Sequence, residues 1–222
     1  MSILTRANFE TAISDRSQEM ALATKTSAEV IRYLDLATQD IRNRHQFREV
    51  RETTNLSFTR STTLPFATVS IPADFWHPSY LNNANEDYYF WWAEPDTIRQ
   101  IVRGGRYSYD DIENIFARDG SDLMIYHDTT ETLVLKYYSR NLVMDTDGTT
   151  DKQTWAAATD TFRIENDDLL ITRVLMYLAQ KEPKTIDQYN LLKTEFLEHL
   201  ENEKSRNPSQ VPLRLEPLVF VG

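Results

Sequence analysis

The spacing of the apolar residues changes twice along this chain, and these changes limit the folds that it can adopt. Over residues 26 to 44 apolar side chains recur every three or four positions, as on one face of a helix. Over residues 54 to 138 they alternate or gather in short runs typical of strands, and from residue 164 to residue 200 the helical period returns. This order predicts an α+β protein, with a helical bundle from the N- and C-terminal helices and a small antiparallel β domain inserted between them.

Four segments follow from these changes. We expect N-terminal helices over residues 1–52, an antiparallel β domain with a short helix and an insertion over 53–145, an αα hairpin that completes the bundle over 146–204, and an extended C-terminal arm over 205–222. A chain of 222 residues is long enough to bury a substantial core in a body of this kind.

The first long helix has both a start and an end signal. Thr26 and Glu29 have the spacing of a capping box. An apolar stripe follows, formed by Val30, Ile31, Leu34, Ala37, Thr38 and Ile41. The stripe then fails, because Phe47 lies about 240° further around a helix of about 3.6 residues per turn. We therefore expect this helix to end near residues 44 to 47.

Further helices are expected on both sides of the β domain. A shorter helix is predicted over residues 5–13, before the capped helix. Towards the C-terminus, apolar residues recur at helical spacing over residues 164–178 and again over residues 186–200, and Pro183 separates the two runs. These two runs predict an αα hairpin.

The middle of the chain begins with alternating patterns. Residues 54–60 and 66–71 are expected to form two strands that pair with each other across a polar turn. The aromatic run YYFWWA at residues 88–93 suits a strand with rings on both faces. A short helix is expected over residues 95–102, since Glu-Pro-Asp precedes it and two glycines follow it.

A second pair of strand patterns, LMIYH and TLVLKYY, lies within residues 122–138. Asp119-Gly120 before them is a dipeptide typical of a hairpin turn, because glycine adopts the positive φ that such turns need. Together with the first pair of strands, these patterns predict the small antiparallel sheet.

Charge and composition narrow the function. The formal net charge of -10 argues against an ordinary nucleic-acid binder, because such proteins concentrate Lys and Arg against the phosphates. The chain has no cysteine, which excludes disulfides and thiolate metal ligands and fits synthesis in a reducing cytoplasm. No stretch approaches the roughly 18 apolar residues of a membrane span, and the first residues lack the layout of a secretory signal. We therefore expect a soluble chain that is not exported.

Motifs for catalysis or metal binding are weak. Four histidines stand without a partner at a metal-binding spacing: His45, His77, His127 and His199. The acidic turn at 145–151 fails as a calcium loop, because two obligatory carboxylate positions would fall on Val143 and Thr154. We expect no catalytic residue, no metal and no cofactor. A pair of carboxylates for glycoside hydrolysis stays open, because such a pair is defined by its separation in space.

Several segments, taken in order, carry a family resemblance. They are EVIRYLDLATQDIRNRHQF at 29–47, IPADF at 71–75, DLMIYHDTTETLVLKYYSRN at 122–141 and the block that begins with Trp155 and ends in a DDLLITRVLMYLA helix. This series resembles the head-to-tail adaptor, or connector, proteins of tailed bacteriophages, the family that includes tail tubular protein A and gatekeeper proteins. Relative to that family, residues 106–118 look like an insertion.

The resemblance implies a structural, non-enzymatic virion protein. About twelve copies would form a ring under the portal by head-to-tail contacts and bridge the portal to a tail or nozzle protein. Genomic DNA would pass through the ring without sequence-specific binding. The protein would lie at the head–tail junction after synthesis in the host cytoplasm, with no membrane and no cofactor.

Candidate functional residues fall in three groups. A basic cluster with an aromatic neighbour suits an acidic partner, and it comprises Arg42, Arg44, Phe47, Arg48 and Arg51. The C-terminal arm is too apolar to stay in water, and its prolines forbid a central strand, so it is expected to dock on another chain. Its anchors are Leu213, Leu215, Leu218 and Phe220. A third group, expected to face the DNA in the channel and repel it, comprises Asp110, Asp111, Glu113 and Asp119.

Two other classes of function stay open. One is a virion-associated peptidoglycan hydrolase, and the other is a host-encoded protein-binding module. A ring seen in negative-stain images would favour the adaptor, whereas turnover that one carboxylate substitution abolishes would favour the hydrolase.

Overall fold

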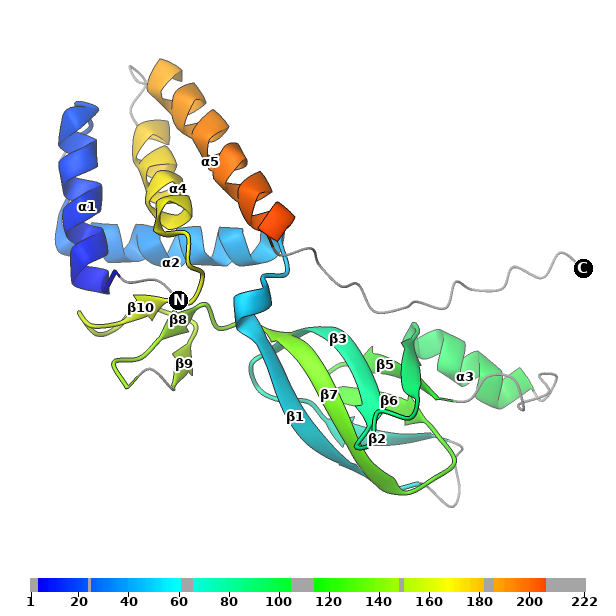
Figure 1. The fold of residues 1–222 in the computed structure, drawn as a ribbon. Coiled ribbons are helices and arrows are strands. Elements are labelled where there is room, and N and C mark those ends of the chain that lie inside the picture. Colours follow the sequence, from blue (N-terminus) through cyan, green and yellow to red (C-terminus); the bar gives the residue numbers. More distant parts are fainter. Residues whose placement is uncertain are drawn as a thin grey trace, which may run out of the picture. The chain divides into compact units, whose positions relative to one another are not determined.

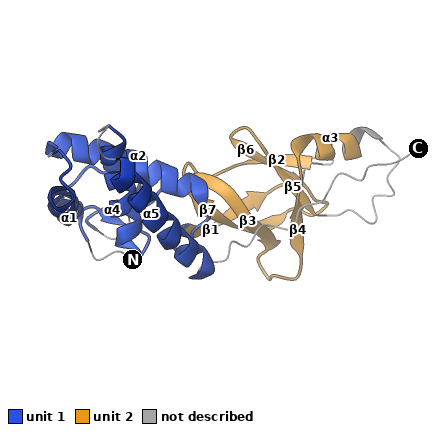
Figure 2. Cartoon of the chain, turned by 90° about the horizontal axis from the view of Figure 1, so that it is seen from above, with its two compact units in different colours: residues 1–50, 140–209 blue, residues 51–139, 210–222 orange. Residues whose placement is uncertain are grey.

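The computed structural model describes residues 4–23, 25–60, 66–104, 114–147, 150–181 and 186–206, with side chains except at 102–104. The chain divides into two compact units, which Figure 2 colours separately. Unit 1 comprises residues 1–50 and 140–209, and unit 2 comprises residues 51–139 and 210–222. The chain therefore leaves unit 1 after Val50 and returns to it at Arg140.

Helices dominate the described part of unit 1 (Figure 1). They are α1 (Arg6–Glu19), α2 (Ser27–Arg44), the short 3₁₀ turn η1 (Arg48–Val50), α4 (Asp167–Gln180) and α5 (Ile186–Arg206). The predicted capping box is present, because the Thr26 hydroxyl accepts from the Glu29 N–H while the Glu29 carboxylate accepts from the Thr26 N–H. α2 ends at Arg44, as its apolar stripe predicted, and α4 and α5 form the predicted hairpin.

α1 continues past the predicted end at residue 13 to Glu19. Ser17 is buried in this last stretch, and its hydroxyl donates to the Ser14 carbonyl at 2.8 Å. A polar residue that satisfies its own hydroxyl on the helix backbone need not break the helix. The helical period alone therefore underestimates the length of α1.

A three-stranded antiparallel sheet also belongs to unit 1. It has the order β10-β8-β9, with β8 (Val143–Met144), β9 (Asp151–Lys152) and β10 (Thr161–Phe162). Beside it, the rings of Phe9 and Trp155 meet edge-on with centroids 5.5 Å apart. The Trp155 indole N–H donates to Thr38 Oγ1 at 2.9 Å, so the segment after β9 is held directly on α2.

Unit 2 is built on a seven-stranded mixed sheet with the order β1-β7-β3-β4-β5-β6-β2. Its strands are β1 (Arg51–Phe58), β2 (Phe66–Ser70), β3 (Phe75–Asn83), β4 (Tyr89–Trp92), β5 (Ile115–Asp119), β6 (Asp122–Tyr126) and β7 (Glu131–Ser139). β4 and β5 run parallel, and every other neighbouring pair is antiparallel. The helix α3 (Pro95–Gly104) lies between the two parallel strands in sequence, as parallel neighbours require a long connection.

The core of unit 2 has two parts. Large side chains of the central strands form the first part, and these include Leu56, Phe58, Phe75, Leu81, Phe116 and Leu135. The second part packs Ile98 and Ile101 of α3 against Ile115 of β5 and Met124 of β6. The IPADF turn is tied to this sheet, because the Tyr137 hydroxyl donates to the Asp74 carboxylate at 3.0 Å.

The predicted fold class is wrong. The sheet is large and mixed instead of small and antiparallel, and the part predicted as a helical bundle contains a second sheet. Strands of two residues leave no periodic pattern to detect. β3 contains Pro78, which argues against a strand in sequence terms. β5 begins inside the stretch that the sequence indicates as an insertion, so no sequence pattern predicts the parallel pair.

The predicted strand partners are wrong as well. The strands at 54–60 and 66–71 do not pair with each other in the described sheet, because β1 pairs with β7 and β2 pairs with β6. The two patterns within 122–138 are also separated, since β6 lies between β5 and β2 while β7 lies between β1 and β3. Alternation reveals which face of a strand is apolar, but the choice of neighbour depends on contacts distant in sequence. The Asp119-Gly120 hairpin is confirmed, with β5 and β6 paired across it.

Candidate functional site

Several residues of the predicted basic cluster make contacts within unit 1. Arg44 Nε lies 2.7 Å from Asp40 Oδ2, and Arg173 Nε lies 2.7 Å from the same oxygen. The guanidinium carbons of both arginines lie 5.4 Å from the centroid of the Phe196 ring. The hydrogen bond to Asp40 raises the pKa of Arg44. Arg44 is therefore a cation that helps to hold α2 against α4 and α5.

Other members of the cluster differ in exposure. Arg42 is half-buried and donates to the Arg140 carbonyl at 3.5 Å, and burial lowers the pKa of Arg42. Phe47 is fully buried, with its ring edge-on to His45 at a centroid distance of 4.9 Å. Arg48 is exposed. The docking role of this cluster stays a prediction, but Phe47 contributes to the core of unit 1 and does not present its ring to solvent.

Most of the other predicted residues lie outside the described part of the chain. This holds for Asp110, Asp111, Glu113, Leu213, Leu215, Leu218 and Phe220. Asp119 is described, and its Oδ2 lies 2.5 Å from Arg99 Nη2. Arg99 also contacts Asp96 on its own helix, so Asp119 belongs to an ion-pair cluster between α3 and the β5–β6 hairpin. An acid that is paired in this way offers little free negative charge to a passing polymer.

A different set of side chains meets on the outer face of the seven-stranded sheet. Tyr80 of β3 lies at its centre, with Arg51 Cζ 5.0 Å and Lys136 Nζ 4.7 Å from the centroid of its ring. Tyr89 of β4 meets the Tyr80 ring edge-on, with centroids 5.8 Å apart. We call the following set the aromatic–cationic surface: Arg51, Tyr80, Glu86, Tyr89, Trp91 and Lys136.

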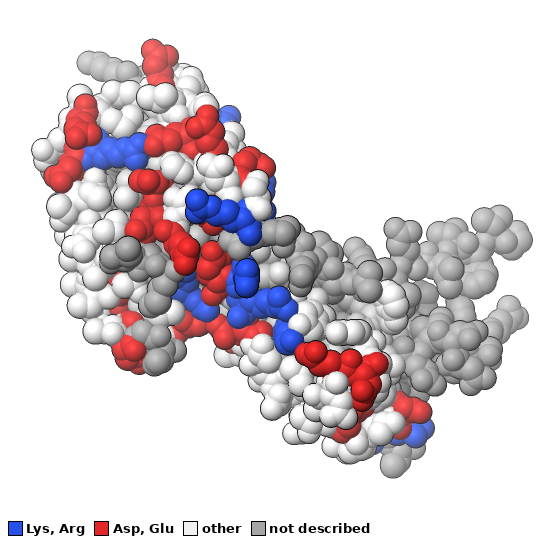
Figure 3. Space-filling view, in the orientation of Figure 1, with Lys and Arg blue, Asp and Glu red and all other residues white. Residues whose placement is uncertain are grey.

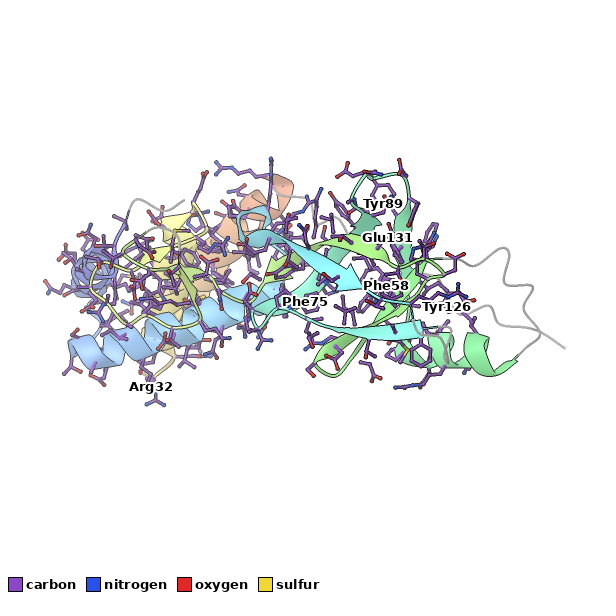
Figure 4. The ribbon with its side chains drawn as sticks, turned by 90° about the horizontal axis from the view of Figure 1, so that it is seen from below. Arg32, Phe58, Phe75, Tyr89, Tyr126 and Glu131 are labelled. Atoms are coloured by element: carbon purple, nitrogen blue, oxygen red, sulfur yellow. The ribbon has the colours of Figure 1, made fainter. Side chains whose placement is uncertain are left out.

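Strand alternation explains why these residues share a face. Leu81 of β3 and Phe90 of β4 pair with each other and point into the core, so Tyr80 and Tyr89, one position before each of them, lie on the opposite face of the sheet. Tyr80 stands opposite Lys136 in the β3–β7 register. Tyr89 is consequently 55% exposed, and Figure 4 shows its side chain beside the strands of unit 2. Trp91, two positions further along β4, is 39% exposed.

Of the two cations on this surface, only Lys136 has a carboxylate partner within the described residues. Lys136 Nζ lies 3.2 Å from Glu86 Oε1, and the hydrogen bond to Tyr80, followed by that to Glu86, raises the pKa of Lys136. Arg51 has no carboxylate partner among the described residues. The surface thus presents a cation without a counter-ion beside two exposed aromatic rings. Tyr, Trp and Arg are the residues that most often dominate the energy of protein–protein contacts.

A second exposed surface lies on the outer side of α5. Leu191 is 64% exposed and Leu197 is 43% exposed, while the opposite side of the helix is buried. We call the shallow depression beside them the α5 groove, lined by Thr194, Leu197, Glu198, Glu201 and Asn202. Glu201 forms an ion pair with Lys204 at 2.7 Å, and Glu198 has no ion-pair partner in the described ranges. The groove is therefore apolar at one edge and acidic along its length.

The charges on the face drawn in Figure 3 agree with protein contacts better than with DNA contacts. On the face drawn in Figure 3, acidic and basic side chains of the described residues are interspersed and form no single basic field. A surface that binds DNA through its phosphates is expected to carry a basic patch or stripe.

A buried polar cluster in unit 2 deserves comparison with a catalytic site. His127 Nδ1 lies 2.6 Å from Asn114 Oδ1, and His127 Nε2 lies 2.5 Å from Glu131 Oε1. The Tyr88 hydroxyl donates to the same Glu131 oxygen and lies 3.1 Å from His127 Nε2. Burial, followed by the bond to Glu131, raises the pKa of Tyr88.

This cluster joins strand ends in the folded sheet. Its residues come from positions next to β4, β5 and β6 and from the start of β7. His127 is only 6% exposed, and the rings of Phe58 and Phe90 pack against it. The imidazole is almost entirely covered in this arrangement, so the cluster is best explained as a polar network that stabilises the sheet. The sequence offered no motif for it, because its members meet only through the strand register.

The described residues contain no group of three or more His, Cys, Asp or Glu side chains arranged to hold a metal ion. Asp145, in the turn that fails as a calcium loop, contacts Lys152 Nζ at 3.0 Å, and this hydrogen bond lowers the pKa of Asp145. Within the same ranges, no helix combines the length and the apolar character that a bilayer crossing demands.

Comparison with protein-family models gives no matching family, and comparison with curated proteins gives no similar sequence. The resemblance to the phage adaptors therefore depends on the order of the motifs quoted above.

Proposed function

We propose that this chain is a structural head-to-tail adaptor of a tailed bacteriophage. In this proposal its copies form a ring under the portal, bridge the portal to a tail or nozzle protein, and let genomic DNA pass. The order of the sequence motifs supports the family, and the aromatic–cationic surface supports the mode of action. That surface is the single observation that carries the proposal, because exposed Tyr and Trp rings suit docking on a protein when they lie beside an Arg that has no carboxylate partner in the described part of the chain.

A role as a hydrolase has weaker support. The strongest candidate group for chemistry is the cluster of Tyr88, His127 and Glu131, and its imidazole is enclosed by aromatic rings. A general acid or base must come within hydrogen-bond reach of its substrate. The buried position of His127 therefore favours a structural protein over an enzyme.

The proposal is tested by assembly. We would measure the self-association of the full chain by sedimentation velocity and image the products in negative stain, with and without portal particles. Rings, or attachment of the chain to the portal vertex, are expected. The variant Tyr89→Ser should weaken assembly roughly tenfold or more, because it removes an exposed interface ring and leaves the core intact.

The matched control is Arg32→Ser, which removes an exposed side chain of α2 that points away from the helix in Figure 4. It should assemble like the unaltered chain. A chain that remains monomeric at every concentration and ignores portal particles would contradict the proposal. Release of peptidoglycan fragments that disappears in Glu131→Gln would favour the hydrolase instead.

A further inference from the structure

The aromatic–cationic surface needs an occupant of a particular chemistry. The two exposed rings, Tyr89 and Trp91, can be buried against an apolar partner surface. The Arg51 guanidinium can donate hydrogen bonds to a negatively charged group such as a carboxylate. Nucleic acid would supply both, but the chain as a whole carries a net charge of -10. A polyanion would therefore be repelled by the chain as a whole, whereas a protein with one or two well-placed carboxylates would not.

The α5 groove has the complementary chemistry. Leu191 and Leu197 supply exposed apolar area, and the Glu198 carboxylate has no ion-pair partner within the described residues. Thr194 and Glu198 are one helical turn apart, a rise of about 6 Å. Tyr89 and Trp91 are separated by two strand positions, about 6.7 Å. Rings and side chains on the two surfaces can thus interdigitate at similar spacings.

The two surfaces belong to different units, so a contact between them has a direction. In a contact between two copies of the same surface, the two sides carry the same net charge. The aromatic–cationic surface has two cations, Arg51 and Lys136, against one carboxylate, and the α5 groove is lined by two carboxylates, Glu198 and Glu201. Like charges at close range oppose such symmetric pairs. A contact between unlike surfaces is heterologous, and repeated heterologous contacts close into a ring when the rotation permits.

We infer that the aromatic–cationic surface of one copy docks in the α5 groove of the next copy, with Arg51 facing Glu198. This inference rests on the proposed function and names the subunit contact that would build the ring. Leu197 provides the apolar edge against which the exposed rings of Tyr89 and Trp91 pack.

Charge reversal tests the contact. Self-association is measured by sedimentation velocity for the unaltered full chain, for Arg51→Glu, for Glu198→Arg and for the chain that carries both changes. Each single reversal should weaken association roughly tenfold or more, since it places like charges together. The double reversal should restore association to within about threefold of the unaltered chain, because the pair is regenerated with opposite polarity. Arg32→Glu changes the net charge by the same amount as Arg51→Glu and should have no effect on association.

A second experiment uses the absence of cysteine from the chain. A chain carrying Tyr89→Cys and Leu197→Cys is treated with a short bismaleimide, and a ladder of covalent multimers is expected. The control pair, Tyr89→Cys with Arg32→Cys, should give no such ladder. Thermal melting confirms that each variant is folded, and the exposed Tyr89→Ser change serves as a further probe if Arg51→Glu does not fold.

The outcomes separate the two claims. If rings form but the single reversals have no effect, or if the double reversal fails to restore association, the inferred contact is wrong and the adaptor function stands. If the unaltered chain neither self-associates nor attaches to portal particles, the adaptor function and this contact are both wrong. Binding of a single-stranded oligonucleotide that is lost in Tyr89→Ser would assign the surface to nucleic acid and overturn the inference.

Discussion

The Tyr88 hydroxyl donates a hydrogen bond to Glu131 Oε1, the oxygen that also lies 2.5 Å from His127 Nε2. The bond joins the segment before β4 to the start of β7. Replacing Tyr88 by Phe should lower the free energy of unfolding of unit 2 by about 1 to 3 kcal/mol, because it removes one donor of a partly buried carboxylate. Urea denaturation measures this change, and Tyr89→Phe, on the exposed neighbour, should leave the midpoint unchanged. Equal midpoints for Tyr88→Phe and the unaltered chain would contradict this view of the cluster.

The pKa of Tyr88 also predicts how the stability of the protein changes at high pH. Burial and the bond to Glu131 raise the pKa of Tyr88 above its ordinary value of 10.0. The folded state then holds the proton more tightly than the unfolded state, so this group makes stability fall as pH rises above about 10. Tyr88→Phe should reduce that slope. Denaturation midpoints measured from pH 8 to pH 11 provide the comparison, and parallel curves for the two chains would rule out the assignment.

The raised pKa of Glu203 predicts how the stability of the protein changes between acid and neutral pH. Its side chain is 1% exposed, and burial, followed by the charge of Glu49, raises the pKa of Glu203 above 4.5. The folded state binds this proton more tightly, so the stability contributed by Glu203 is present at low pH and is lost as pH rises through the raised pKa. Glu203→Gln should therefore stabilise the protein near neutral pH. The exposed Glu201→Gln is the control, and a lower melting temperature for Glu203→Gln at pH 7 would count against the prediction.

Leu34 tests the packing of α2. It is fully buried, and an unpaired carboxylate at this place costs several kcal/mol against a total stability of about 5 to 15 kcal/mol. Leu34→Asp should unfold unit 1, whereas Arg32→Asp on the exposed side of the same helix should be tolerated. Circular dichroism of the two purified variants distinguishes them. A melting curve for Leu34→Asp like that of the unaltered chain would show that the side chain is not in the core.

Gly120 tests the β5–β6 hairpin. It has a φ of +65°, and a Cβ atom added there would meet no heavy atom within 4 Å. The cost of Gly120→Ala is consequently backbone strain alone, about 1 kcal/mol, because side chains disfavour this conformation. Gly120→Asn should cost less, since Asn tolerates the left-handed region. Thermal melting of the two variants gives the order, and an Ala variant as stable as the Asn variant would argue against the positive φ.

Local signals identified the helices well. The capping box of α2, its apolar stripe and its end at Arg44 are all encoded within a few residues of where they act. The ion pair of Arg44 with Asp40 also joins residues four positions apart. The sequence nevertheless indicates Arg44 as part of a basic cluster, because the neighbouring arginines are more prominent than the single aspartate. α5 extends beyond the predicted stripe to Arg206.

The sheet and the candidate surface depend on contacts that a single sequence does not display. The parallel pairing of β4 with β5 requires α3 to bring the two strands together, and no local pattern states that they are neighbours. The sequence indicates Arg51 as a docking residue through its charge alone. Its position against Tyr80, and that of Lys136 beside it, arise from the registers of β1, β7 and β3. The aromatic run of β4 did indicate rings on both faces, and Tyr89 and Trp91 lie on the exposed one.

Arg51 and Tyr138 are direct partners in the β1–β7 register, so the segment 51–139 of unit 2 begins and ends on adjacent strands. Its entry and exit are therefore separated by little more than the spacing of two strands, about 5 Å. A domain with closely spaced ends can be gained, lost or exchanged in evolution as a cassette, since the host chain needs only a short linker to close the gap. A chain in which two or three glycines replace residues 51–139 is thus the natural minimal form of unit 1. The same two positions are the natural places to graft a different sheet.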